Sequence, residues 1–268
     1  MVKVIHRSQS AQVQEKLNKW VSYLESGKKL IDCFTGKDGK LKEGFEISFY
    51  DYLELANSIG TQTFKIRFGL VNDDDGDPKF ALFLWGEDKE ANQTTPFLQV
   101  DYQDWITPPS ILHIIYNGSG QGLPSTTIPA LLAYDRLAAW NDAANDPDFS
   151  FADLFQLEQY KTGLQGYTYQ RVDFVSILNG FNDFIKSEQQ MRDLEKAFKV
   201  RLNFNCLSYN FEGKNFRNGY FDLLILAITK PASEPADAEK GDENSKTEIR
   251  GIFSDTGIPC PPLCGGGS

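Results

Sequence analysis

The chain has 268 residues, and its hydrophobic share of 41% with 13% aromatic residues is that of a globular protein with a substantial core. Its net charge of −10 and its lack of a Lys and Arg cluster exclude wrapping of a nucleic-acid backbone, because phosphate binding needs clustered cations. The longest apolar run, residues 223–228, is too short to cross a bilayer, and residues 1–7 lack the apolar core of a secretory signal, so we expect a cytoplasmic protein without a membrane span.

The first part of the chain predicts two helices and a β-hairpin. One helix is indicated by apolar residues that share a face at helical spacing: Val13, Leu17, Trp20, Val21 and Leu24. Gly27 is a natural end for this helix, and a second helical stretch covers 49–59. The alternating segment 64–68 and the apolar segment 80–85, joined by the polar turn 72–79, predict the hairpin.

The middle of the chain predicts two strands and then three helices. The strands are 97–102 and 111–116, which a Pro-Pro step separates. Helical spacing of apolar residues predicts a helix over 128–140. Capping-box patterns predict two more helices, over 150–160 and over 187–197.

A second hairpin, formed by 198–209 and 219–229, closes the folded body, which we expect to be an α+β unit of residues 1–230 with helices packed on antiparallel hairpins. The first five residues of this second hairpin, Phe198-Lys-Val-Arg-Leu202, resemble Phe64-Lys-Ile-Arg-Phe68 of the first hairpin. Two interpretations remain open. One is a tandem helix-hairpin duplication with halves 1–116 and 117–230, and the other is a resemblance by composition alone.

The composition changes abruptly at Pro231. From there on, seven acidic residues stand against three basic ones, a net −4 of the chain's −10. Residues 231–248 are too polar to bury anything, which predicts a flexible, disordered acidic linker. Residues 249–264 form an apolar, Cys-flanked tail peptide, and 265–268 have the composition of an engineered linker remnant.

The most unusual local feature is Cys260-Pro-Pro-Leu-Cys264. Its thiols are open to a small-loop disulfide, a shared metal, a covalent bond to a partner, or no role at all. Two thiolates supply only half of a tetrahedral zinc site, and the chain has only two histidines. We therefore expect no metal and no cofactor.

The other candidate sites fit their chemistry poorly. The acidic run 72–78 invites calcium, but with Asp73 at the first ligand position the EF-hand glycine is replaced by Pro78 and the twelfth-position glutamate is missing, which favours a solvated hairpin turn. The glycine-rich segment 117–122 lacks the spacing of a phosphate-binding loop. His113 lies among apolar residues, which favours a structural role. No catalytic residue is assigned.

The leading functional hypothesis is a non-catalytic binding or assembly protein that presents its tethered C-terminal peptide to a protein partner, to another copy, or to its own body. The residues expected to make this contact are Ile252, Phe253, Ile258, Cys260, Pro261, Pro262, Leu263 and Cys264. One alternative is a carboxylate-dependent hydrolase with an aromatic-lined cleft. Another is metal or redox chemistry at the C-terminal Cys pair.

Overall fold

We describe the protein from a computed structural model. It describes residues 2–106, 130–146, 150–157, 162–172, 174–175, 198–208, 219–229, 250–254 and 258–259.

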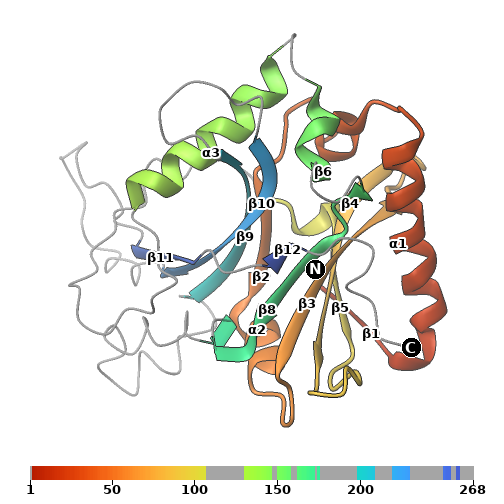
Figure 1. Cartoon of the computed structure of the whole chain (residues 1–268), viewed down its shortest axis with the longest axis vertical. Coiled ribbons are helices and arrows are strands. Elements are labelled where there is room, and N and C mark those ends of the chain that lie inside the picture. The colour runs from red at the N-terminus through yellow and green to blue at the C-terminus, as the bar shows by residue number, and fades with distance from the viewer. Residues whose placement is uncertain are drawn as a thin grey trace, which may run out of the picture.

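Two antiparallel sheets lie face to face between helices (Figure 1). The six-stranded sheet has the order β1 (Lys3–Ile5), β5 (Phe97–Val100), β4 (Pro78–Glu87), β3 (Thr63–Asn72), β8 (Gly166–Gln170) and β12 (Ile258–Pro259). The four-stranded sheet has the order β11 (Arg250–Ser254), β10 (Gly219–Thr229), β9 (Phe198–Ser208) and β2 (Gly44–Ser48), and a small separate pair joins β6 (Gln156–Leu157) to β7 (Thr162–Gly163). The predicted α+β class with helices on antiparallel hairpins is confirmed.

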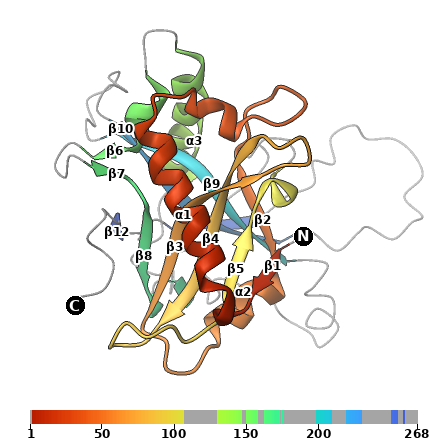
Figure 2. The ribbon, with the colours of Figure 1, turned by 90° about the vertical axis from the view of Figure 1, so that its right-hand side faces the viewer.

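The helices are α1 (Ser10–Glu25), α2 (Phe49–Ala56) and α3 (Ala130–Asn145), with short 3-10 turns η1 (Arg7–Gln9), η2 (Leu30–Phe34), η3 (Tyr102–Asp104) and η5 (Phe151–Phe155). Helix α1 crosses the outer face of β3, β4 and β5 (Figure 2), while α3 lies beside β9 and β10 in Figure 1. The protein thus has four layers in the order α1, six-stranded sheet, four-stranded sheet and α3.

The core between the sheets is built from aromatic rings. Phe80 of β4 and Phe221 of β10 belong to different sheets, and their ring centroids are 5.9 Å apart. Phe34 of η2 lies 4.5 Å from Phe80, and Phe155 of η5 stacks on Phe221 at 4.6 Å. Because rings at these distances attract one another beyond simple area burial, the cluster joins the two sheets into one core.

Helix α1 approaches β3 closely at Gly69, where a Cβ atom would lie 3.2 Å from the Lys16 carbonyl and 2.6 Å from the Phe83 ring. Val13 packs on Phe83 in the outer cluster. Trp20 instead reaches the core between the sheets, and its Nε1 donates to the Leu164 carbonyl at 2.9 Å. The apolar stripe predicted for this helix therefore serves two separate clusters.

Several predicted elements are confirmed by the structure. Helix α1 ends as predicted, with Gly27 at a positive φ of 65°. Ser48 begins α2 by accepting a hydrogen bond from the Asp51 amide. Both hairpins form, as β3–β4 and β9–β10. The predicted strand 111–116 and helix 187–197 lie outside the described residues.

The helix predicted over 150–160 is wrong. The chain forms the single 3-10 turn η5 and then the strand β6. Ser150 makes no side-chain cap, because the Asp153 amide donates to the Ser150 backbone carbonyl instead. Leu154 and Phe155 are both fully buried, and a straight α-helix turns adjacent side chains 100° apart, so packing in the core overrides the local capping signal.

The tandem duplication remains a prediction. The two similar segments begin the hairpins of different sheets, β3 in one and β9 in the other. Helix α2 precedes β3, but residues 176–197 before β9 lie outside the described part of the chain. Within the described residues, no helix is both long and apolar enough to cross a membrane.

Candidate functional site

The C-terminal segment supplies an edge strand to each sheet. Strand β11 pairs antiparallel with β10 over five residues, from Ile225 opposite Ser254 to Thr229 opposite Arg250. Strand β12 pairs with β8, with Ile258 opposite Thr168 and Pro259 opposite Tyr167. Proline has no amide hydrogen and is tolerated at sheet edges, which is where Pro259 lies.

The residues predicted to contact a partner are only partly described. Ile252 and Phe253 lie in β11, and Ile258 lies in β12. Cys260, Pro261, Pro262, Leu263 and Cys264 lie outside the described residues, as does the predicted linker 231–248. The contact role of these eight residues therefore stays a prediction. Their acceptor strands, β10 and β8, were not predicted as such, because an edge cannot be told from a central strand by sequence alone.

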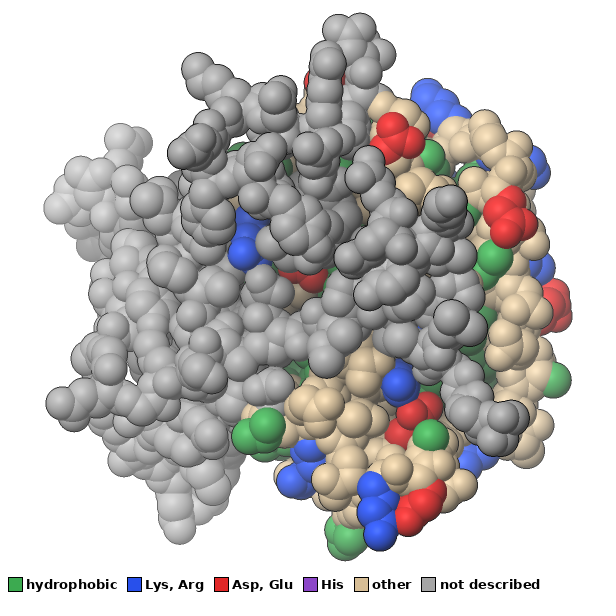
Figure 3. Space-filling view, in the orientation of Figure 1, with side chains coloured by type: hydrophobic (Ala, Val, Ile, Leu, Met, Phe, Trp, Pro, Cys, Tyr) green, Lys and Arg blue, Asp and Glu red, His purple; other side chains and the backbone are tan. Residues whose placement is uncertain are grey.

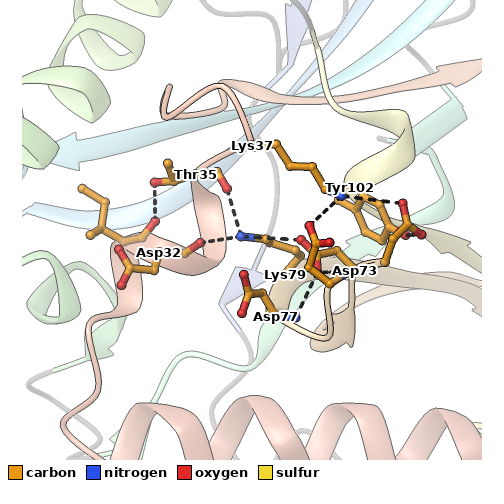
Figure 4. A network of polar contacts seen from close by, with 10 residues as sticks. Asp32, Thr35, Lys37, Asp73, Asp77, Lys79 and Tyr102 are labelled. Atoms are coloured by element: carbon orange, nitrogen blue, oxygen red, sulfur yellow. Dashed lines mark hydrogen bonds and ion pairs between the residues drawn. The ribbon is translucent and has the colours of Figure 1, made fainter.

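A second cluster surrounds the turn between β3 and β4 (Figure 4). The ammonium group of Lys79 donates to the backbone carbonyls of Asp32 and Thr35 at 3.3 and 3.2 Å, and lies 3.9 Å from the Asp73 carboxylate. Asp73 Oδ1 accepts from the amides of Asp75 and Asp77. Lys79 thus ties the hairpin turn to the end of η2.

The outer part of this cluster is also paired. Lys37 lies 2.7 Å from Asp75 and 3.9 Å from Asp74, whose carboxylate also accepts from the Tyr102 hydroxyl. Within the described residues, no group of three metal-ligating side chains converges. The predicted hairpin turn is confirmed, but it is not fully solvated, since Asp73 is only 7% exposed. The Lys37 and Lys79 ammonium groups pair with three carboxylates of this turn, those of Asp73, Asp74 and Asp75.

Cys33 lies next to the Lys79 cluster. Burial raises the pKa of its thiol to about 11, although a hydrogen bond with Tyr23 and, to a smaller extent, the charge of Lys79 oppose this shift, so the thiol is neutral near pH 7. Burial likewise raises the pKa of the neighbouring Tyr23 hydroxyl to about 12, with a smaller contribution from Cys33. A thiol in this state is a poor nucleophile and metal ligand.

Several cavities are lined by described residues. One of ≈ 640 Å³ lies between the turn 57–62 and Arg171, Val172 and Val175, and its rim carries the fully exposed Ile59. One of ≈ 450 Å³ lies between the ends of α1 and α3, beside Lys28 and Phe151. Neither brings two carboxylates together.

The smallest cavity, ≈ 140 Å³, does bring two carboxylates together, Asp51 and Glu54 of α2. Phe97 is its only aromatic lining residue among those described, and the volume is below the roughly 300 Å³ of a typical ligand cleft. The Asp51 carboxylate also accepts a hydrogen bond from the Ser48 hydroxyl at the start of α2. The hydrolase alternative gains no geometric support from this site and stays a prediction.

Acidic and basic side chains alternate over the described part of the face shown in Figure 3. A comparison with protein-family models, with curated proteins and with solved structures found no significant match. The function must therefore be argued from the geometry of this chain.

Proposed function

We propose that the protein is a non-catalytic binding or assembly module whose sheet edges accept an extended peptide strand. Its own C-terminal segment is the resident strand. The observation that carries the proposal is the pairing of β11 with β10 and of β12 with β8. Strand addition of this kind is a common mode of peptide recognition, in which backbone hydrogen bonds supply affinity.

The connection between β10 and β11 supports this reading. β10 ends at Thr229 and β11 begins at Arg250, so a long, acidic segment separates two directly paired strands. Closing a long loop costs little more than closing a medium one, because each doubling of length adds only about 0.6 kcal/mol. The tether also keeps the tail at a high local concentration. A free strand therefore competes poorly with the resident tail while the tether is intact, and competes well once the tether is cut.

The test uses the full chain with a protease site inserted within 231–248 and cut after folding. A fluorescent peptide with the sequence of residues 249–264, kept reduced, is then added. We expect it to bind the nicked protein and displace the cut tail, and to bind the intact protein much more weakly, as measured by anisotropy.

A matched control peptide carries Phe253→Pro, which removes a backbone amide hydrogen from the fourth of the five residues of β11. We expect it neither to bind nor to displace the tail. The proposal is wrong if the cut tail leaves a folded body that binds neither peptide, or if both peptides bind equally well.

A further inference from the structure

Arg67 of β3 stands apart from the other basic residues in the interior. Its Nη1 atom is buried and donates no hydrogen bond to any of the described residues. Arg7 and Arg171, by contrast, donate to the carbonyls of Thr95 and Ala56. A buried donor atom without a hydrogen-bond acceptor is costly, so the unpaired Nη1 needs an explanation.

The position of Arg67 follows from the register of the sheet. Phe64, Ile66 and Phe68 face the core between the sheets, so Arg67 faces outward, on the side that α1 partly covers. Its cross-strand neighbours are Phe83 on β4 and Gly166 on β8. Gly166 has no side chain, so β8 places none beside Arg67 at this position of the ladder.

Two more cations lie on the same face, and each has its own partner. Lys65 donates to the Thr168 hydroxyl at 3.1 Å and lies 3.6 Å from the Glu87 carboxylate. Lys16 of α1 donates to Gln99 at 2.7 Å and lies 5.7 Å from the centre of the Phe83 ring, directly across from Arg67.

Counted together, Lys16, Lys65 and Arg67 give +3 and Glu87 gives −1, so the face carries +2 in a chain whose net charge is −10. Four further charges act on Lys16, the cations Lys3 and Lys19 and the anions Asp101 and Glu15, and they leave this sum unchanged. The face therefore has an excess positive charge, and Arg67 is the member of the group with free donors.

We propose that Arg67 anchors a binding site for an oxyanion, a carboxylate or phosphate group, on the outer face of the six-stranded sheet. The planar guanidinium fork donates two parallel hydrogen bonds to either group, which is the geometry that Arg provides and Lys does not. The Lys16 and Lys65 ammonium groups add a favourable potential from both sides. This site does not depend on the strand-acceptor function.

The test measures Tm at constant ionic strength in chloride, in inorganic phosphate and in malonate. The wild-type protein should gain at least about 2 °C in one or both oxyanions, because a ligand that binds only the folded state stabilises it. A rise in Tm in phosphate alone indicates a phosphate site, and a rise in malonate alone indicates a carboxylate site. A rise in both indicates a site that accepts either group. Isothermal titration with the same anions gives the affinity directly.

Three variants make the test specific to Arg67. Arg67→Met should lose the response and, in chloride, melt no lower than wild type, since a buried donor without an acceptor has been removed. Arg67→Lys keeps the charge without the fork and should bind at least tenfold more weakly. Arg171→Met, which removes an arginine with a partner, should keep the full response.

The proposal is overturned if neither oxyanion raises the wild-type Tm, or if Arg67→Met responds as wild type does. It is also overturned if Arg67→Met melts well below wild type in chloride, because the guanidinium group would then already be compensated. Should Arg67→Met fail to fold, the comparison of Arg67→Lys with Arg171→Met still decides the question.

Discussion

Cys33 and Tyr23 show how burial controls the chemistry of individual side chains. Both are held neutral because a charged form would lose its hydration, and the cationic Lys79 only partly offsets this for Cys33. The same ammonium group binds two backbone carbonyls and Asp73. These residues form a structural cluster, in contrast to Arg67, whose buried donor atom has no described acceptor.

The raised pKa of Cys33 predicts a loss of stability in alkali. The unfolded thiol releases its proton near pH 9, whereas the folded thiol holds it up to about pH 11. Between these values the folded state binds more protons, so the free energy of unfolding falls as pH rises, by about 2–3 kcal/mol in total for two pKa units. The contribution is fully present below pH 9.

Urea unfolding across this pH range measures the effect, with Cys33→Ala as the control. The variant should show a shallower decline than wild type up to about pH 11, and the decline caused by Tyr23 should also be smaller in it, because Cys33 contributes to the raised pKa of Tyr23. Parallel curves for the two proteins would contradict the assignment to Cys33.

At the scale of single elements, the pairing of β3 with β8 depends on Gly166. This residue has a φ of +145°, and a Cβ atom there would lie 2.0 Å from the Ile66 carbonyl oxygen. Gly39 also has a positive φ, of 70°, but a Cβ atom there meets nothing within 4 Å. A side chain at Gly39 therefore adds backbone strain alone, whereas a side chain at Gly166 adds both backbone strain and a steric clash.

We expect Gly39→Ala to cost about 1 kcal/mol from strain alone. Gly166→Ala should cost at least about 2 kcal/mol more, because the clash is with backbone that cannot move without breaking the β3–β8 ladder. Urea midpoints of the two variants measure the difference. Equal losses would show that the sheet adjusts at Gly166.

Elements whose signal is local were predicted from sequence, and those set by distant contacts were not. The spacing of Val13, Leu17 and Trp20 gave α1, and alternating residues gave both hairpins. The helix expected after Ser150 failed because Phe155 stacks on Phe221, a contact invisible to a local pattern. Strands β2 and β8 were missed, although the buried Tyr167 and Tyr169 alternate with polar residues.

The candidate sites follow the same division. The tail was singled out by its composition, but the strands that receive it are known only from the sheet order. Arg67 was visible in the sequence merely as the polar member of an alternating strand. Its neighbours in the sheet, Phe83 and Gly166, are set by strand pairing, so no signal in the local sequence identifies its unpaired donor atom.

On the scale of the whole molecule, one aromatic core joins both sheets. Phe221 of β10 contacts Phe68 and Phe80 of the other sheet at 5.4 and 5.9 Å. Trp20 of α1 lies 5.1 Å from Phe80 in the same cluster. We therefore expect both sheets to unfold in a single cooperative transition.

Tryptophan fluorescence and far-ultraviolet circular dichroism should give coincident urea transitions. Phe221→Ala should lower the stability of the whole protein by about 3–5 kcal/mol, since it leaves a cavity between the sheets. Tyr50→Ala, at a side chain that is 51% exposed, should change it by less than about 0.5 kcal/mol. Two separate transitions, or a loss seen by only one probe, would show that the sheets unfold independently.

The sheet order also determines when each strand finds its neighbour during synthesis. Strand β2 ends at Ser48, but its ladder partner β9 begins only at Phe198. Strand β3 likewise pairs with β8, which begins only at Gly166 and is therefore synthesised much later. Pairing between such distant segments is slow, so the nascent chain carries apolar strands with open edges until most of it has left the ribosome. The early β3–β4 hairpin, folded back on itself and covered by α1, is the part that forms without waiting.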